Sequence, residues 1–249
     1  MRRFHLRLLT ATFAATVFYS SMAFFAEAQS PARDYASESA FHLVQNGHVD
    51  DAIAVYSKQI AAEPDNYILY LRRGLVLYNL HDYGSAIEDL TEAARLSPNK
   101  IKTAADLGDQ RWNSGDPITH AWALELEIHV VRADALQHLN RFDEALTDLD
   151  TAVSMHPKHA LNRHARGVVR MLIGRYDDAI EDFDTVLGQN EVVSDTLFAR
   201  GLAYFCKEDW LNAKDDFARA AKIAPRNAKI AEWLKRLTDK TRALGISTT

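Results

Sequence analysis

Pairs of aspartates separated by one residue are the first candidates for chemistry, because neighbouring carboxylates can act as general acid and general base. Asp148 and Asp150 form one such pair, and Asp182 and Asp184 form another. Asp148, Asp182 and Asp216 are, however, spaced 34 residues apart. Recurrence at a fixed interval predicts a solvent-exposed feature of a repeated element rather than a single active site.

Histidines could instead hold a metal ion. His120, His129 and His138 are nine residues apart, which places neighbours on opposite sides of one helix. His156 and His159 have no third ligand at zinc-site spacing. No nucleophile elbow, phosphate loop or zinc-protease motif occurs in the sequence. The sequence therefore predicts no metal, no cofactor and no enzymatic activity.

The first 28 residues have the composition of an export signal. Three arginines precede an uncharged, mostly apolar stretch from Leu8 to Phe25, and small residues stand before an expected cleavage site after Ala28. We expect export, with the bacterial periplasm favoured because no Asn-x-Ser/Thr sequon occurs. The alternative is an uncleaved membrane anchor, since the apolar stretch approaches the ~20 residues that span a bilayer.

Charge and cysteine content narrow the possible partners. Cleavage after Ala28 would remove three positive charges and one negative charge, so the net charge would change from −5 to −7. Such a surface repels phosphate backbones, so we expect no nucleic-acid partner. Cys206 is the only cysteine, which excludes an intramolecular disulfide. We expect Cys206 to pack on a helix as a small apolar residue, the alternative being a bond to a partner.

The chain after residue 28 is organised by the 34-residue interval. Within 67–100, apolar residues recur at helical spacing on both sides of a turn, which predicts a helical hairpin. Glycines such as Gly47 and Gly174 stand at the fifteenth position of a unit, where the first helix would end. A short segment, 29–32, precedes the repeated units, which are 33–66, 67–100, 126–159, 160–193 and 194–227.

These features resemble the tetratricopeptide repeat, whose signature has small residues at positions 8 and 20 and a bulky apolar residue at position 24. Position 8 holds Ala40, Gly74, Ala133, Gly167 and Gly201. Position 20 holds Ala52, Ala86, Ala145, Ala179 and Ala213, and position 24 holds Tyr56, Leu90, Leu149, Phe183 and Phe217. The resemblance implies an all-α solenoid of antiparallel helix pairs, wound as a right-handed superhelix, that binds another protein.

The resemblance also implies a binding groove, lined in this family by positions 2, 5, 9, 12 and 13 of the first helices. Carried onto this chain, these positions give Phe41, Val44, Ile68, Leu71, Leu75, Tyr78, Trp112, Leu161, His164, Val168, Met171, Phe198, Leu202 and Phe205. An exposed apolar groove suits an amphipathic helix or an apolar peptide. We therefore expect a protein or peptide partner, in envelope assembly or secretion. The alternatives are filling by the chain's own residues 29–37, by its long helix, or by a second copy in a homodimer.

The repeat interval fails once, between Ala86 and Ala145, which are 34 plus 25 residues apart. Residues 101–125 therefore form a degenerate or truncated repeat, with a first helix at 101–113. A single long helix is expected over 117–139, because Pro117 favours a helix start and no glycine or proline follows. We expect a kink that divides the array into 33–113 and 117–244, and a capping helix over 228–245.

Overall fold

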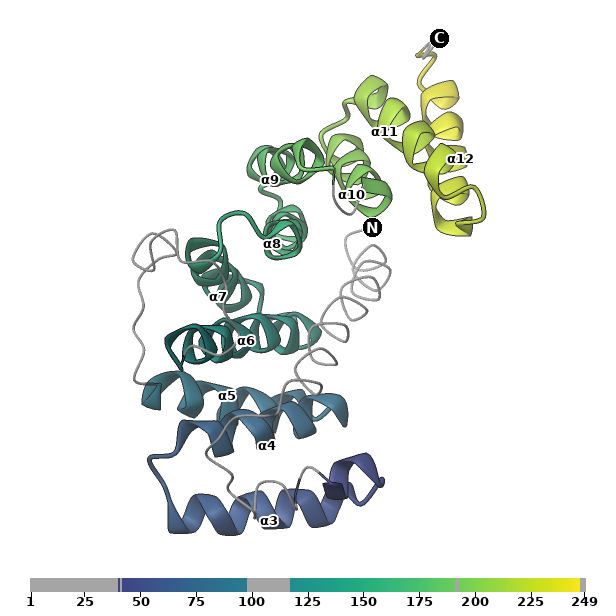
Figure 1. Cartoon of the computed structure of the whole chain (residues 1–249). Coiled ribbons are helices and arrows are strands. Elements are labelled where there is room, and N and C mark those ends of the chain that lie inside the picture. Colours follow the sequence, from purple (N-terminus) through teal and green to yellow (C-terminus); the bar gives the residue numbers. More distant parts are fainter. Residues whose placement is uncertain (1–39, 41, 98–116, 191–192, 247–249) are drawn as a thin grey trace. The chain divides into compact units, whose positions relative to one another are not determined.

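The computed structural model describes residues 40, 42–97, 117–190 and 193–246, with only the backbone for 117–122, and every regular element in these ranges is a helix (Figure 1). The chain divides after Pro157 into two compact units, each of which is described by itself. None of the described helices is both long and apolar enough to cross a bilayer. The predicted export signal and the predicted helix at 101–113 lie outside the described residues, as do Phe41 and Trp112.

The first unit contains α3 (Val49–Ala62), α4 (Tyr67–Asn79), α5 (Tyr83–Leu96), α6 (Pro117–His138) and α7 (Phe142–Met155). Consecutive helices pack against one another, and α4 also contacts α6. The side chains of Asn66 and Asp82 each accept a hydrogen bond, 3.2 Å long, from a backbone N–H in the first turn of α4 or α5. Such caps satisfy donors that the helix leaves unpaired, and so fix where each helix begins.

The second unit contains α8 (Ala160–Leu172), α9 (Tyr176–Gly188), α10 (Val193–Cys206), α11 (Trp210–Ile223) and α12 (Ala228–Ala243). The last helix, α12, packs against α11 and ends before Gly245, whose φ is 65°. It buries Ile230, Trp233 and Leu237 and leaves most of its charged residues exposed, as expected of a capping helix. Cys206 was expected to be packed but is exposed, because it lies in the last turn of α10.

The small residues of the repeat signature permit the two helices of a pair to touch. A Cβ on Gly201 would lie 2.7 Å from the ring of Phe217, and one on Gly167 would lie 2.7 Å from the ring of Phe183. Both rings are fully buried. The position-20 alanines are fully buried as well: Ala52, Ala86, Ala145, Ala179 and Ala213. The signature therefore marks close contacts at which a larger side chain would force the helices apart.

The turn inside each hairpin uses a left-handed residue even where no glycine is available. Gly47 and Gly174 have φ of 80° and 87°, and the equivalent residues His81, Asn140 and Glu208 have φ of 62°, 59° and 65°. This conformation carries a steric cost for residues with a Cβ, which is smallest for asparagine. The backbone of the repeat, rather than the residue present, therefore sets the turn.

The long helix agrees with the prediction, because α6 runs without interruption for 22 residues. The predicted division of the array between 113 and 117 is wrong, since α5 packs against α6 and the units divide after Pro157. Arg132 on α6 donates to Thr91 on α5 (3.3 Å), and Tyr78 on α4 donates to Asp134 on α6. The C-terminal part of α6 therefore serves as an ordinary first helix, and stacking continues across the irregular repeat.

Candidate peptide-binding surface

The aspartates that recur with the repeat are buried, so the prediction that they are solvent-exposed is wrong. Each accepts two hydrogen bonds, 2.6–2.9 Å long, from an arginine that lies 16 residues earlier on the first helix of the same repeat. The pairs are Arg73 with Asp89, Arg132 with Asp148, Arg166 with Asp182, and Arg200 with Asp216. The aspartates are only 1–6% exposed. A forked guanidinium explains this burial, because it occupies both carboxylate oxygens at once.

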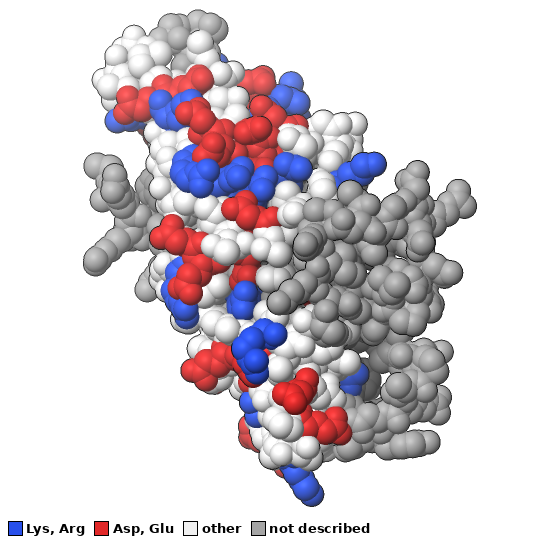
Figure 2. Space-filling model, turned by 90° about the vertical axis from the view of Figure 1, so that its left-hand side faces the viewer, with Lys and Arg blue, Asp and Glu red and all other residues white. Residues whose placement is uncertain are grey.

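The same arginines also join neighbouring repeats. Arg73 donates through Nη1 to Ser57 (2.9 Å), and Arg200 donates through Nη1 to Asp184 (2.5 Å). One side chain thus holds the helices of its own repeat together and reaches the second helix of the repeat before it. Figure 2 shows other acidic and basic side chains interspersed at the surface. The paired carboxylates are structural, because the chain's own donors occupy them.

Local contacts give the paired aspartates different acidities. Burial raises the pKa of Asp216, and the hydrogen bonds from Arg200 only partly oppose that rise. Burial acts on Asp148 in the same direction, but hydrogen bonds from Arg132 and His129 outweigh it and hold the pKa of Asp148 below its usual range. His129 Nδ1 lies 2.7 Å from Asp148. This histidine is therefore a partner of an aspartate, and the described residues contain no group of three side chains suited to a metal ion.

In the first unit, the predicted groove residues divide between surface and core. Val44, Ile68 and Tyr78 are half-buried, whereas Leu71 is fully buried and Leu75 is only 8% exposed. The two leucines therefore stabilise the unit instead of offering an apolar surface. Among the predicted groove positions of α4, Ile68 and Tyr78 are therefore the two that remain partly exposed.

A polar set on α6 lies beside α4, and the sequence-based prediction omitted it. Asp134 accepts a hydrogen bond from Tyr78, and His138 Nε2 lies 3.3 Å from the same carboxylate. The His138 ring stacks on Tyr83, with 4.2 Å between centroids. Burial and the neighbouring Asp134 raise the pKa of Tyr78. The family's groove positions, applied to the repeat 126–159, would have selected Asp134 and His138. In that repeat these positions are Glu127, Val130, Asp134, Gln137 and His138.

Glu127 is the most unusual member of that set. Both of its carboxylate oxygens are buried, and neither has a hydrogen-bond partner among the described residues. Burial raises the pKa of Glu127 to about 8. Asp134 and His138 follow at seven and eleven residues, which places all three on one face of α6. We call Ile68, Tyr78, Glu127, Asp134 and His138 the α4–α6 face.

In the second unit, α8 turns most of its predicted groove residues into the core. Leu161 is half-buried, whereas His164, Val168 and Met171 are buried. His164 Nδ1 lies 3.0 Å from Thr196 Oγ1, and burial lowers the pKa of His164 to about 4. The chain therefore supplies a partner for the buried imidazole.

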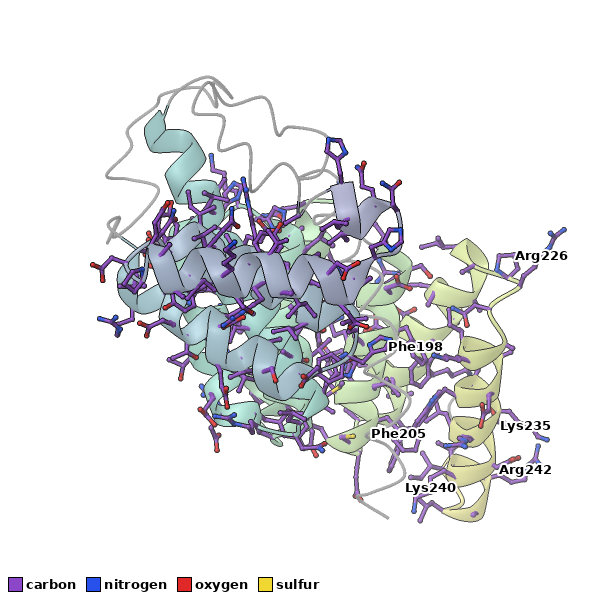
Figure 3. All side chains as sticks on the ribbon, turned by 90° about the horizontal axis from the view of Figure 1, so that it is seen from below. Phe198, Phe205, Arg226, Lys235, Lys240 and Arg242 are labelled. Carbon is purple, nitrogen blue, oxygen red and sulfur yellow. The ribbon has the colours of Figure 1, made fainter. Side chains whose placement is uncertain are left out.

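The predicted groove residues of α10 meet the capping helix. Leu202 is buried, Phe198 packs on a cluster that includes Ile230, and the Phe205 ring lies 5.3 Å from the Trp233 ring, centroid to centroid. Figure 3 shows Phe198 and Phe205 on the side of α10 toward α12, while Lys235 and Arg242 of α12 point away from α10. The cap therefore covers much of the apolar surface that α10 was expected to offer.

Two comparisons with known proteins bear on the sequence. A family model described as Tetratricopeptide repeat matches residues 40–101, 130–190 and 164–228. The chain is 26% identical over 204 residues to Tetratricopeptide repeat protein 13 of Homo sapiens, covering 80% of this chain and 17% of that protein. It is 29% identical over 129 residues to the Hsp70-Hsp90 organizing protein of Triticum aestivum, covering 51% of this chain and 21% of that protein. The chain thus spans about a fifth of the length of these curated relatives.

Solved structures agree on the fold. YrrB, described as a TPR protein with an unusual peptide-binding site, superposes with a TM-score of 0.66 at 19% identity, covering 80% of this chain and 90% of YrrB. MamA from Desulfovibrio magneticus RS-1 superposes with a TM-score of 0.63 at 14% identity, covering 80% of this chain and 99% of the MamA chain. At these identities the likeness shows the fold alone. Because the family model matches more than half of the chain, the protein belongs to the tetratricopeptide repeat family of protein-interaction scaffolds.

Proposed function

We propose that this protein is an exported, non-catalytic adaptor that binds a protein or peptide segment on the α4–α6 face. One observation carries the proposal: this face combines half-buried Ile68 and Tyr78 with a carboxylate, Glu127, whose oxygens have no partner among the described residues. The paired aspartates of the repeats are occupied by arginine, so they provide no general base. A surface with apolar and polar groups but no paired catalytic residues suits recognition rather than turnover.

The binding surface is tested by in-cell crosslinking and pull-down of full-length wild type and of Ile68→Asp. Ile68 is a better site for this change than Leu75, because a charge at the buried Leu75 would unfold the unit. Leu211→Asp is the matched control, since Leu211 is 62% exposed in the other unit. We expect Ile68→Asp to lose the specific captured proteins and Leu211→Asp to retain them, with equal helicity by circular dichroism. An unchanged set of proteins with folded Ile68→Asp would exclude the α4–α6 face as the binding surface.

Export is a separate part of the proposal, supported by the basic and then apolar composition of the first 28 residues. We propose a periplasmic location and a role in envelope assembly or secretion. Mass spectrometry of the protein purified from its native host tests export directly. A mature chain that begins at Gln29 supports it, and a chain that begins at Met1 and sediments with membranes supports the anchored alternative.

A further inference from the structure

Most buried carboxylates among the described residues are paired with donors from the chain itself. In the described repeats, each position-23 aspartate has a bidentate arginine, and Asp182 has three arginines within 3.4 Å. Asp134 has Tyr78 and His138. Glu127 alone among the described carboxylates has two buried oxygens that both lack a hydrogen-bond donor.

An unpaired buried carboxylate is costly, so its presence calls for an explanation. Removing an ionised carboxylate from water without a donor is strongly unfavourable, unless the group holds a proton. Burial raises the pKa of Glu127, and neither carboxylate oxygen accepts a hydrogen bond from a described residue that would offset this rise. Groups of this kind are over-represented at binding sites, where a ligand supplies the missing partner.

The surroundings of Glu127 select the charge of that partner. The ionisable groups on the same face are Tyr78 from α4, and Asp134 and His138 from α6. Burial, and to a smaller extent the neighbouring Glu125 of α6, raises the pKa of Tyr67 at the start of α4. Burial also raises the pKa of Glu125, one of whose oxygens is buried and unpaired. No lysine or arginine contributes to these described contacts. The face is therefore complementary to a cation.

We infer that Glu127 is the recognition carboxylate for an arginine side chain of the bound segment, carried among apolar residues that pack near Ile68. This inference rests on the proposed function of the α4–α6 face and specifies the chemistry of its partner. Two free oxygens match the two parallel N–H groups of a guanidinium, which makes arginine a better fit than the single ammonium group of lysine. The aliphatic stem of arginine also suits the approach to a buried group through apolar surroundings.

Fluorescence anisotropy with the full-length protein tests the inference. The probe is a fluorescein-labelled amphipathic helix of about 18 residues, built from leucine, alanine and glutamine, with one central arginine. Its control carries citrulline, which has nearly the same shape without the charge, at that position. Above pH 8, we expect wild type to bind the arginine peptide at least about tenfold more tightly, as one charge-assisted contact allows.

The variants Glu127→Gln and Glu88→Gln separate the site from general electrostatics, because both remove one acidic charge and Glu88 is exposed on α5. Glu127→Gln should bind both peptides alike, and Glu88→Gln should keep the tenfold preference. Equal binding of both peptides by wild type, or a preference that survives Glu127→Gln, would overturn the arginine site and leave the proposed binding function of the α4–α6 face intact. Failure of wild type to bind either peptide would count against both.

A photo-crosslinking residue at position 68 identifies the occupant. Crosslinks to the arginine peptide support a partner segment. Crosslinks only to the same chain or to a second copy, in the presence of saturating peptide, would show that the chain itself fills this face and would overturn the inference.

Discussion

Glu127 in the first unit and His164 in the second both stand at family groove positions on a first helix, yet their surroundings differ, although the carboxylate oxygens of Glu127 and the His164 side chain are all buried. The imidazole of His164 lies 3.0 Å from the hydroxyl of Thr196, so the chain provides its partner. The carboxylate of Glu127 has no described partner on either oxygen. In the second unit α12 also covers the aromatic residues of α10. The same repeat therefore produces one first-helix face whose polar group is satisfied internally and one whose polar group is left for a ligand.

The largest expected effect comes from removing one of the paired carboxylates. Asp182→Ala should lower the free energy of unfolding by about 3–5 kcal/mol, because it leaves three half-buried arginines without their buried counter-charge. Urea denaturation measures this loss, and Glu181→Ala, on an exposed position of the same helix, should change it by less than about 0.5 kcal/mol. A loss below about 1 kcal/mol for Asp182→Ala would mean that the ion pairs contribute no more than surface pairs.

Glu127 should make the protein less stable as the pH rises. The pKa of Glu127 is about 8 in the folded chain and near the ordinary 4.5 when the chain is unfolded, so folded molecules hold the proton over a range in which unfolded ones release it. The free energy of unfolding should therefore fall between about pH 4.5 and pH 8. Glu127→Gln should remove this slope and be more stable than wild type at pH 8, by a few kcal/mol at most. Thermal denaturation curves that coincide for the two proteins across this range would contradict the buried, unpaired state.

His164 should produce the opposite dependence. Its pKa is about 4 when folded and 6.5 when unfolded, so unfolded molecules bind a proton first as the pH falls. Its contribution to stability is complete above pH 6.5 and should be lost between pH 6.5 and pH 4. His164→Gln removes the titrating group and keeps a hydrogen-bonding side chain near Thr196. The free energy of unfolding of His164→Gln should decrease less than that of wild type as the pH falls from 6.5 to 4. An equal decrease would exclude His164 as the cause.

The smallest expected effect concerns the hairpin turns. Glu208 has a φ of 65° and is exposed, whereas the equivalent turn residue in the preceding repeat is Gly174. Glu208→Gly should raise the melting temperature slightly, corresponding to about 0.5–1 kcal/mol, since glycine adopts this conformation without a Cβ clash. The reverse change, Gly174→Ala, should lower it. A stabilising Gly174→Ala would show that the turn is not strained.

The sequence predicts the helical hairpins well, because alanine and glycine at fixed repeat positions directly report contacts such as Gly201 with Phe217. It also predicts α6 as one long helix from the absence of breaking residues. The burial of Asp182 was missed, although Arg166 stands 16 residues before it and the spacing recurs in other repeats. Aspartates that recur every 34 residues give the same sequence pattern whether they are exposed to solvent or buried in ion pairs. Only the packing of the helices distinguishes the two cases.

The candidate surface was less predictable than the fold. Leu71 and Leu75 stand at family groove positions but are buried, because neighbouring helices cover them. Glu127 occupies a groove position in the repeat that follows the irregular one, and its importance depends on whether a hydrogen-bond donor lies nearby. The absence of such a donor among the described residues is a property of three-dimensional packing, which residue spacing does not encode.

The most direct measurement is the pKa of Glu127 itself, followed by carbon-detected NMR of its side-chain carboxylate in the full-length protein, with and without the arginine peptide. We expect a pKa of about 8 in the free chain, because the carboxylate is buried without a partner. The arginine peptide should lower that pKa and the citrulline peptide should not, since only a guanidinium stabilises the ionised carboxylate. A pKa near 4.5 in the free chain, or one that the arginine peptide leaves unchanged, would contradict the account.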